Sequence, residues 1–216
     1  RLYMLSDSPP DRDLEWTEAG IQGAWRFLNR LWRMVDFDNK DLFDSAQETP
    51  EDLGALTSIH REMHKTIAHV TKDFDRFHFN RAVARIREFS SLIADIASTS
   101  DEAVWLKRHG CKVILQLIGP VAPHIAEELW QRLGYKDLLV DSPWPEYDPS
   151  LLIDDTVTIA VQVNGKLRGT IEVPRDNNKE KTKAEALLLE NVQRAIDGKP
   201  PRKVVVIPNK VVNVVI

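Results

Sequence analysis

The chain has 216 residues and a net charge of −4, with 43% hydrophobic and 29% charged residues. Its single cysteine, Cys111, excludes an internal disulfide and a zinc site built from several cysteines. No apolar run approaches the roughly 20 residues that cross a bilayer, and nothing resembles a signal peptide, so we expect a cytoplasmic protein that does not associate with membranes.

The net charge conceals two parts of opposite sign. Residues 157–216 carry 11 Lys and Arg against 6 Asp and Glu, whereas residues 1–156 carry 18 against 27. Such asymmetry favours a polyanion as the partner of the basic part. The length suits two domains, and we expect them at residues 1–145, with a connector over 1–16, and at 157–216. An acidic, proline-bearing linker is expected at 146–156.

The first part of the chain has the period of helices. Apolar residues spaced three and four apart predict five helices, over residues 17–35, about 50–70, 80–98, 100–118 and 122–133. Thr49 followed by Pro50 is typical of a helix N-terminus, and Gly134 is typical of the position after a helix. Four long helices and one shorter helix with short connections predict an antiparallel bundle.

The helix predicted over residues 17–35 has two distinct faces. Its apolar stripe includes Trp25 and Trp32, which we expect in the core. The opposite face carries three arginines with no acid to neutralise them: Arg26, Arg30 and Arg33. Such a face is ordinarily just solvated, but three guanidiniums in a row also suit contacts with successive phosphates. Two further tryptophans, Trp130 and Trp144, are expected to fasten the last helix to the linker.

From residue 157 the period changes to two. Asn164 and Gly165 separate two alternating apolar runs, and this pair favours a type I′ hairpin turn. A helix and two more strands follow, which gives the order ββαββ over residues 157–163, 167–173, 179–195, 203–208 and 211–216. The predicted fold is therefore mainly α, an antiparallel helical bundle followed by a small α+β C-terminal domain.

Basic side chains of the second part are candidates for contact with a polyanion. Lys166 and Arg168 follow the turn directly, whereas Asn164 and Gly165 have a structural role in forming it. The other candidates lie near the end of the chain: Lys199, Arg202, Lys203 and Lys210.

Two groups of residues could indicate an enzyme site. His60 and His64 lie one helical turn apart, a spacing that can bind zinc, but Glu62 is misplaced for an HExxH site and no third ligand is evident. Cys111 lies in an apolar helix without a partner motif. We predict no catalytic residue and no metal site, and we retain a helical metalloenzyme and a standalone protein-interaction module as alternatives.

Several motifs together resemble bacterial leucyl-tRNA synthetases, which are class I aminoacyl-tRNA synthetases. They are SPPDRDLEW, WRFLNRLWRMV, APHIAEELW, SPWPEYD, VQVNGKLRG and KVVNVVI. Valyl and isoleucyl enzymes carry sequence similar to APHIAEELW. The C-terminal module distinguishes the leucyl enzymes, because valyl enzymes resemble coiled-coil arms there and isoleucyl enzymes typically carry zinc-binding cysteines.

The resemblance implies a C-terminal fragment of an enzyme that attaches leucine to tRNA(Leu) with ATP and Mg²⁺. The HIGH and KMSKS signatures of ATP binding do not occur in these residues. We therefore expect no cofactor, no catalysis and no editing from this chain by itself, and the N-terminal RLYML resembles the interior of a longer polypeptide.

The resemblance also implies tRNA binding. The helical anticodon-binding-type domain would lie along the inner side of the L-shaped tRNA, and the C-terminal domain would reach its elbow. The nine basic residues named above would then contact the RNA backbone, which positions a protein without reading sequence. The implied partners are tRNA(Leu) and the remaining domains of the parent synthetase, and we expect a monomer.

Overall fold

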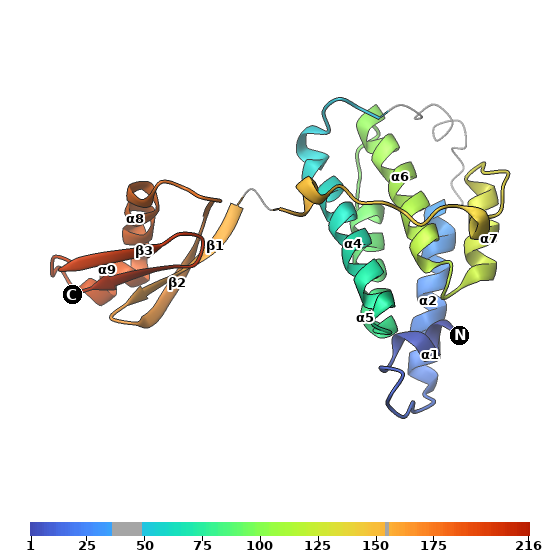
Figure 1. Cartoon of the computed structure of the whole chain (residues 1–216), viewed down its shortest axis with the longest axis horizontal. Coiled ribbons are helices and arrows are strands. Elements are labelled where there is room, and N and C mark those ends of the chain that lie inside the picture. The colour runs from blue at the N-terminus through green and yellow to red at the C-terminus, as the bar shows by residue number, and fades with distance from the viewer. Residues whose placement is uncertain (36–48, 154–155) are drawn as a thin grey trace. The chain divides into compact units, whose positions relative to one another are not determined.

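The computed structural model describes residues 1–35, 49–153 and 156–216. It divides into two compact units, Arg1–Leu152 and Ile153–Ile216, which Figure 1 shows as a helical part and a part with a sheet. The division falls inside the linker predicted at 146–156, of which residues 154 and 155 lie outside the described residues. No described helix is both long and apolar enough to cross a membrane.

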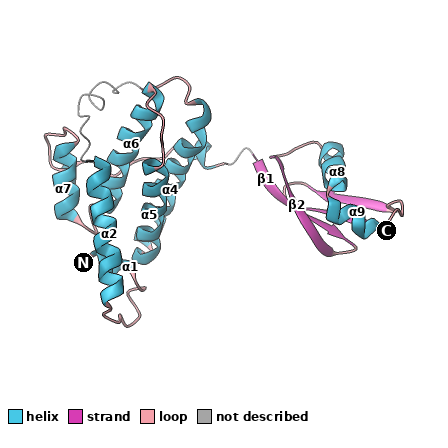
Figure 2. Ribbon diagram, turned by 180° about the vertical axis from the view of Figure 1, so that it is seen from behind, coloured by secondary structure: helices cyan, strands magenta, loops and turns pink. Residues whose placement is uncertain are grey.

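The first unit is a helical bundle, as predicted. Its elements are α1 (Leu2–Ser6), α2 (Glu18–Val35), η1 (Gly54–Leu56), α4 (Thr57–Asp75), α5 (Phe79–Ala94), α6 (Asp101–Ile118), α7 (Pro123–Arg132), η2 (Leu139–Asp141) and η3 (Pro149–Leu152). Helix α6 is the centre of the core, since Leu106, Ile114 and Leu117 are fully buried. Helices α4 and α5 pack against α6 in both ribbon views (Figures 1 and 2).

The second predicted helix begins later than Pro50. Helix α4 starts at Thr57, because Gly54 has a φ of +50° and its amide donates a 2.8 Å bond to Asp52 Oδ1. This turn uses the left-handed region that glycine tolerates, and the helical backbone cannot pass through it. The helix predicted over residues 100–118 is α6. Its N-cap is Ser100, whose Oγ accepts a hydrogen bond from the Ala103 amide.

The prediction that Trp25 lies in the core is wrong. Its side chain is 65% exposed, because the buried face of α2 is turned toward Phe27, Leu31 and Met34. Trp32 is partly buried and packs against the core, and the Arg132 guanidinium lies 4.3 Å from the centre of its ring.

The segment that follows α7 is fastened to the bundle. Trp144 Nε1 donates a 2.8 Å bond to Thr71 Oγ1 on α4, so the prediction that Trp144 fastens the last helix is wrong. Trp130 does tie α7 to the chain after it, through a bond from its Nε1 to Asp137 O. Further along, the Asp148 amide donates to His64 Nδ1 at 3.0 Å. Much of the predicted linker is therefore part of the first unit.

The second unit is a four-stranded sheet with two helices. Its elements are β1 (Thr156–Val163), β2 (Lys166–Pro174), α8 (Lys179–Leu188), α9 (Glu190–Ile196), β3 (Lys203–Ile207) and β4 (Val211–Val215). The strand order is β2-β1-β4-β3, with β1 and β4 parallel and the other neighbours antiparallel. Both helices lie on one face of the sheet (Figure 2) and cover a core that includes Val161, Val192 and Val212.

The single helix predicted over residues 179–195 is two helices. Leu189 has an extended backbone, with φ −62° and ψ 126°, so the chain leaves the helical path there and begins α9 at the next residue. Leu188, just before the break, is 78% exposed.

Candidate nucleic-acid interface

The β1–β2 turn is bound to the last strand of the sheet. Asn164 and Gly165 have φ values of +47° and +79°, as a type I′ turn requires. The Asn164 amide donates to Val214 O at 2.8 Å. The side chain of Asn213 accepts from the Gly165 amide at 3.1 Å, and the side chain of Asn164 accepts from the Ile216 amide at 3.1 Å. The turn thus has a fixed position on β4.

Arg168 occupies a β-bulge. In the β1–β2 ladder Gly169 pairs with Val161 and Leu167 pairs with Gln162, so Arg168 has no partner residue on β1. A bulge turns side chains away from their regular direction. Leu167, which the alternation would bury, is consequently 60% exposed. The Arg168 Nε atom is buried and makes no hydrogen bond among the described residues.

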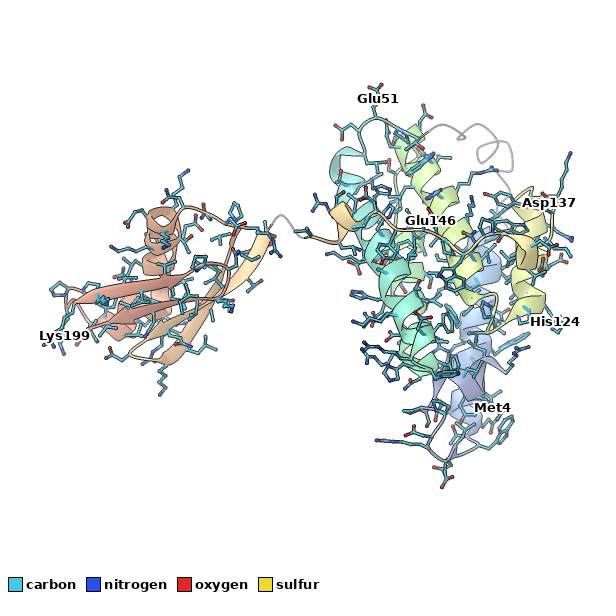
Figure 3. The ribbon with its side chains drawn as sticks, in the orientation of Figure 1. Met4, Glu51, His124, Asp137, Glu146 and Lys199 are labelled. Atoms are coloured by element: carbon cyan, nitrogen blue, oxygen red, sulfur yellow. The ribbon has the colours of Figure 1, made fainter. Side chains whose placement is uncertain are left out.

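Most of the basic candidates gather at one end of the sheet. Lys203 pairs with Val215 at the end of β4, and the Arg202 amide donates to Val215 O at 2.8 Å. The β1–β2 turn lies at the same end, since Val163 pairs with Lys166 on one side and with Val214 on the other. Figure 3 shows Lys199 at this end too, where Figure 1 marks the C-terminus.

Lys210 lies at the opposite end of the sheet. It belongs to the turn between β3 and β4, where its amide donates to Ile207 O. Asp176 brings a carboxylate to that end, where two hydrogen bonds of 2.8 and 2.9 Å join it to Asn209. With a rise of about 3.3 Å per strand residue, Lys210 is on the order of 15 Å from Lys203. We define the basic end of the sheet as Lys166, Arg168, Lys199, Arg202 and Lys203.

The three arginines predicted on α2 are exposed and share one face. Arg30 Nη1 donates to Ser91 Oγ on α5 at 2.9 Å, and Arg33 Nε donates to Asn29 O at 3.3 Å. Sequence reasoning missed a fourth arginine beside them, Arg87 of α5, because no sequence pattern indicates that α5 packs beside this face of α2. Its guanidinium lies 4.9 Å from the centre of the Phe27 ring.

The paired histidines and the single cysteine lie in half-buried and buried positions of the helical unit. His60 Nε2 and His64 Nε2 are 3.2 Å apart, and burial lowers the pKa of both imidazoles. Among the described residues, no group of three or more His, Cys, Asp or Glu could hold a metal ion. Burial raises the pKa of Cys111 to about 12, so its thiol is protonated and unreactive at neutral pH.

More than half of the chain matches one known protein family. Residues 57–184 match the family described as the anticodon-binding domain of tRNA ligase. The chain belongs to this family. The matched range starts with α4 of the bundle and extends through β1 and β2 into α8, so the anticodon-binding domain match spans parts of both units.

Curated relatives of this chain are leucine–tRNA ligases. They confirm the resemblance of its motifs to leucyl-tRNA synthetases. The relatives from Paramagnetospirillum magneticum, Rhodospirillum rubrum and Rhodospirillum centenum are 52%, 48% and 47% identical, and each alignment covers the whole chain. The chain spans about a quarter of the length of these relatives, 25% to 26%.

A solved structure shares the fold of this chain over its whole length. It is the crystal structure of the ternary LeuRS-tRNA-LeuAMS complex of Agrobacterium radiobacter K84 agnB2. The TM-score is 0.81 at 28% sequence identity, and the similarity covers 100% of this chain and 28% of that one. This likeness confirms the predicted fold class, a helical bundle followed by a small α+β domain.

Proposed function

We propose that this chain is the tRNA-binding C-terminal part of a leucine–tRNA ligase, which positions tRNA(Leu) and does no chemistry by itself. The observation that carries the proposal is the basic end of the sheet, where five cationic side chains and a fixed turn lie together. Its support is the similarity to leucine–tRNA ligases over the whole chain and to the solved structure of a LeuRS-tRNA-LeuAMS complex.

The chemistry of this surface suits an RNA backbone. Lysine and arginine side chains on a rigid turn and strand can contact several phosphates without reading bases. Binding of this kind releases counterions, so the logarithm of the affinity falls linearly with the logarithm of the salt concentration. The exposed arginines Arg26, Arg30 and Arg33 of α2 offer a second row of cations on the helical unit.

A binding titration with a tRNA(Leu) transcript at several salt concentrations tests the proposal. We expect Lys166→Glu combined with Arg168→Glu to weaken binding more than tenfold and to reduce the slope of the salt dependence by about two. The matched control, Lys181→Glu combined with Lys210→Glu, changes the charge equally at sites outside the basic end and should weaken binding much less. Equal effects of the two variants would contradict a localised interface.

A wild-type chain that binds no tRNA in a salt-dependent manner at low ionic strength would refute the proposed function altogether. In that case the alternative of a protein-interaction module gains weight. Circular dichroism of each variant is needed beside the titration, because loss of binding counts only where the fold is retained.

We further propose that the chain contacts the remaining domains of the ligase and is a monomer. Three large apolar side chains near its N-terminus favour such a contact, since Met4, Trp16 and Trp25 are 57%, 70% and 65% exposed. Figure 3 labels Met4 on α1. Light scattering tests the monomer, and a dimer abolished by Trp16→Ser would instead assign these residues to self-association.

The longer enzyme is proposed to use ATP and Mg²⁺ in the cytoplasm for leucine attachment. We assign no residue of this chain to either cofactor, because the two ATP-binding signatures of the family do not occur in its sequence. A leucine-dependent exchange assay between pyrophosphate and ATP should give no activity with this chain. Detectable exchange would refute that assignment.

A further inference from the structure

A groove between α2 and α5 brings together arginines from two helices. It has a volume of about 390 Å³ and is lined by Arg26 and Arg30 of α2 and by Arg87, Glu88 and Ser91 of α5. Residues 26 and 30 are one helical turn apart, as are 87 and 91, so each helix presents two groove residues in line. The groove therefore has three positive charges and one negative charge.

Arg87 is held in the groove with hydrogen-bonding capacity unused. Its guanidinium packs over the Phe27 ring at 4.9 Å, and its Nε atom is buried without a hydrogen-bond partner in the described part of the chain. Burial, and then the charge of Arg30, lower the pKa of Arg87. A half-buried cation next to a second cation is unfavourable unless an anion relieves it.

Arg30 is oriented toward the same space. Its Nη1 donates to Ser91 Oγ at 2.9 Å, across the groove from α2 to α5. No ion pair of Arg26, Arg30 or Arg87 with a carboxylate is found among the described residues. The contrast is with Arg85, two residues before Arg87, whose Nε lies 2.8 Å from Asp73 Oδ2. The chain thus neutralises Arg85 internally and leaves the groove arginines available.

We propose that this groove binds one phosphate group of an RNA backbone, with Arg87 at its centre and Arg26 and Arg30 approaching from the facing helix. This proposal rests on the proposed function and identifies a site within it that the sequence did not predict. Guanidiniums favour phosphate because they donate paired hydrogen bonds to its oxygens. The groove is open to solvent along the exposed face of α2, so a chain of phosphates can pass over it.

The geometry gives the groove residues different roles from Arg33. Arg33 shares their helix but does not line the groove, and its Nε donates to Asn29 O. Arg33 should add only general attraction for RNA. Arg30 and Arg87 should act on the same phosphate, so their effects on binding should be coupled. Glu88 on the rim should oppose binding, because its charge repels the ligand.

The test is a double-mutant cycle on the 216-residue chain, with affinity for a tRNA(Leu) transcript measured at several salt concentrations. We expect Arg87→Gln to weaken binding roughly tenfold and to reduce the slope of the salt dependence by about one. The combination of Arg30→Gln and Arg87→Gln should weaken binding by less than the product of the single effects. Arg33→Gln with Arg87→Gln should give the product, and Glu88→Gln should tighten binding.

Two variants separate phosphate contact from packing. Arg87→Lys keeps the charge and should retain part of the affinity and the salt slope, whereas Arg87→Met keeps much of the packing on Phe27 and should lose both. Thermal unfolding followed by tryptophan fluorescence identifies any variant that fails to fold. Unchanged affinity and slope for a folded Arg87→Gln variant would overturn the proposal.

Inorganic phosphate distinguishes failure of this site from failure of the proposed function. The Arg87 Nε–Hε resonance should shift on addition of phosphate and not of chloride at equal ionic strength, and the shift should weaken in the Arg30→Gln variant. If that shift occurs in a chain that does not bind tRNA, the RNA assignment falls. If poly-glutamate competes better than RNA, the ligand is an acidic protein and the RNA assignment is likewise overturned. No shift and no RNA effect would refute the site.

Discussion

Two helical glycines should respond oppositely to the same substitution. Gly23 of α2 has no atom within 4 Å of the position that a Cβ would occupy. At Gly110 of α6 the same added atom would lie 2.5 Å from Ile93 Cδ1 and 2.8 Å from Ile93 Cγ1. Alanine is favoured over glycine in a helix interior by about 1 kcal/mol. Gly23→Ala should therefore raise the free energy of unfolding of the helical unit by about this amount.

Gly110→Ala gains the same helical preference but must displace Ile93. That side chain is 1% exposed and has no solvent to move into, so the added methyl overpacks the core at a cost of about 1–3 kcal/mol. The net change should be a loss of up to about 2 kcal/mol once the helical preference of about 1 kcal/mol is subtracted. Combining it with Ile93→Val should restore part of the loss, because the shorter side chain removes the nearest atom.

Urea unfolding followed by tryptophan fluorescence measures these effects on the correct unit. All six tryptophans precede residue 153, within the unit Arg1–Leu152, so the signal reports the bundle alone. A Gly110→Ala variant that is stabilised as much as Gly23→Ala would refute the close contact with Ile93. A Gly23→Ala variant that is less stable would refute the open space beside α2.

Three further predictions concern the bundle. Asp73 is 4% exposed and receives a 2.8 Å bond from Arg85 Nε, so Asp73→Asn should lower the free energy of unfolding by about 2 kcal/mol in urea titrations; an unchanged midpoint would contradict this. Burial lowers the pKa of His109 from 6.5 to about 4, so the unfolded chain binds a proton that the native chain does not. This contribution to stability is complete above pH 6.5, decreases as the pH falls below that value and is lost by about pH 4. The total loss is at most about 3 kcal/mol. His109→Gln should remove this pH dependence, which unfolding curves at pH 7 and 5 would measure. His64→Ala removes the acceptor of the Asp148 amide, so limited proteolysis between residues 145 and 156 should accelerate; unaltered cleavage would show that the other contacts of this segment suffice.

The sequence predicted those features that depend on local chemistry. The alternation around Asn164 and Gly165 is a property of neighbouring residues, and the resulting hairpin is present with the expected positive φ values. The helical period likewise located the principal helices of the bundle. Boundaries failed where one residue changed the backbone, at Gly54 before α4 and at Leu189 between α8 and α9.

Features that depend on contacts between distant segments could not be predicted. Trp25 is a large apolar residue on the predicted apolar stripe of α2, yet the packing of α2 leaves its side chain exposed. Arg87 has the sequence environment of an ordinary solvated face, and only the approach of α5 to α2 places it beside Arg30. The two ends of the sheet likewise separate Lys210 from the other basic residues only once the strand order is known.

The position of β4 has a consequence for how the C-terminal unit folds. The hairpins β1–β2 and β3–β4 join residues close in sequence, whereas the bond between Asn164 and Ile216 joins residues 52 positions apart. Closing that long loop has an entropic cost that the local hairpins avoid, so pairing of β1 with β4 should be the slow step. The two halves of the basic end lie on separate hairpins until then. The surface proposed to bind RNA is therefore assembled last, by the final strand of the chain.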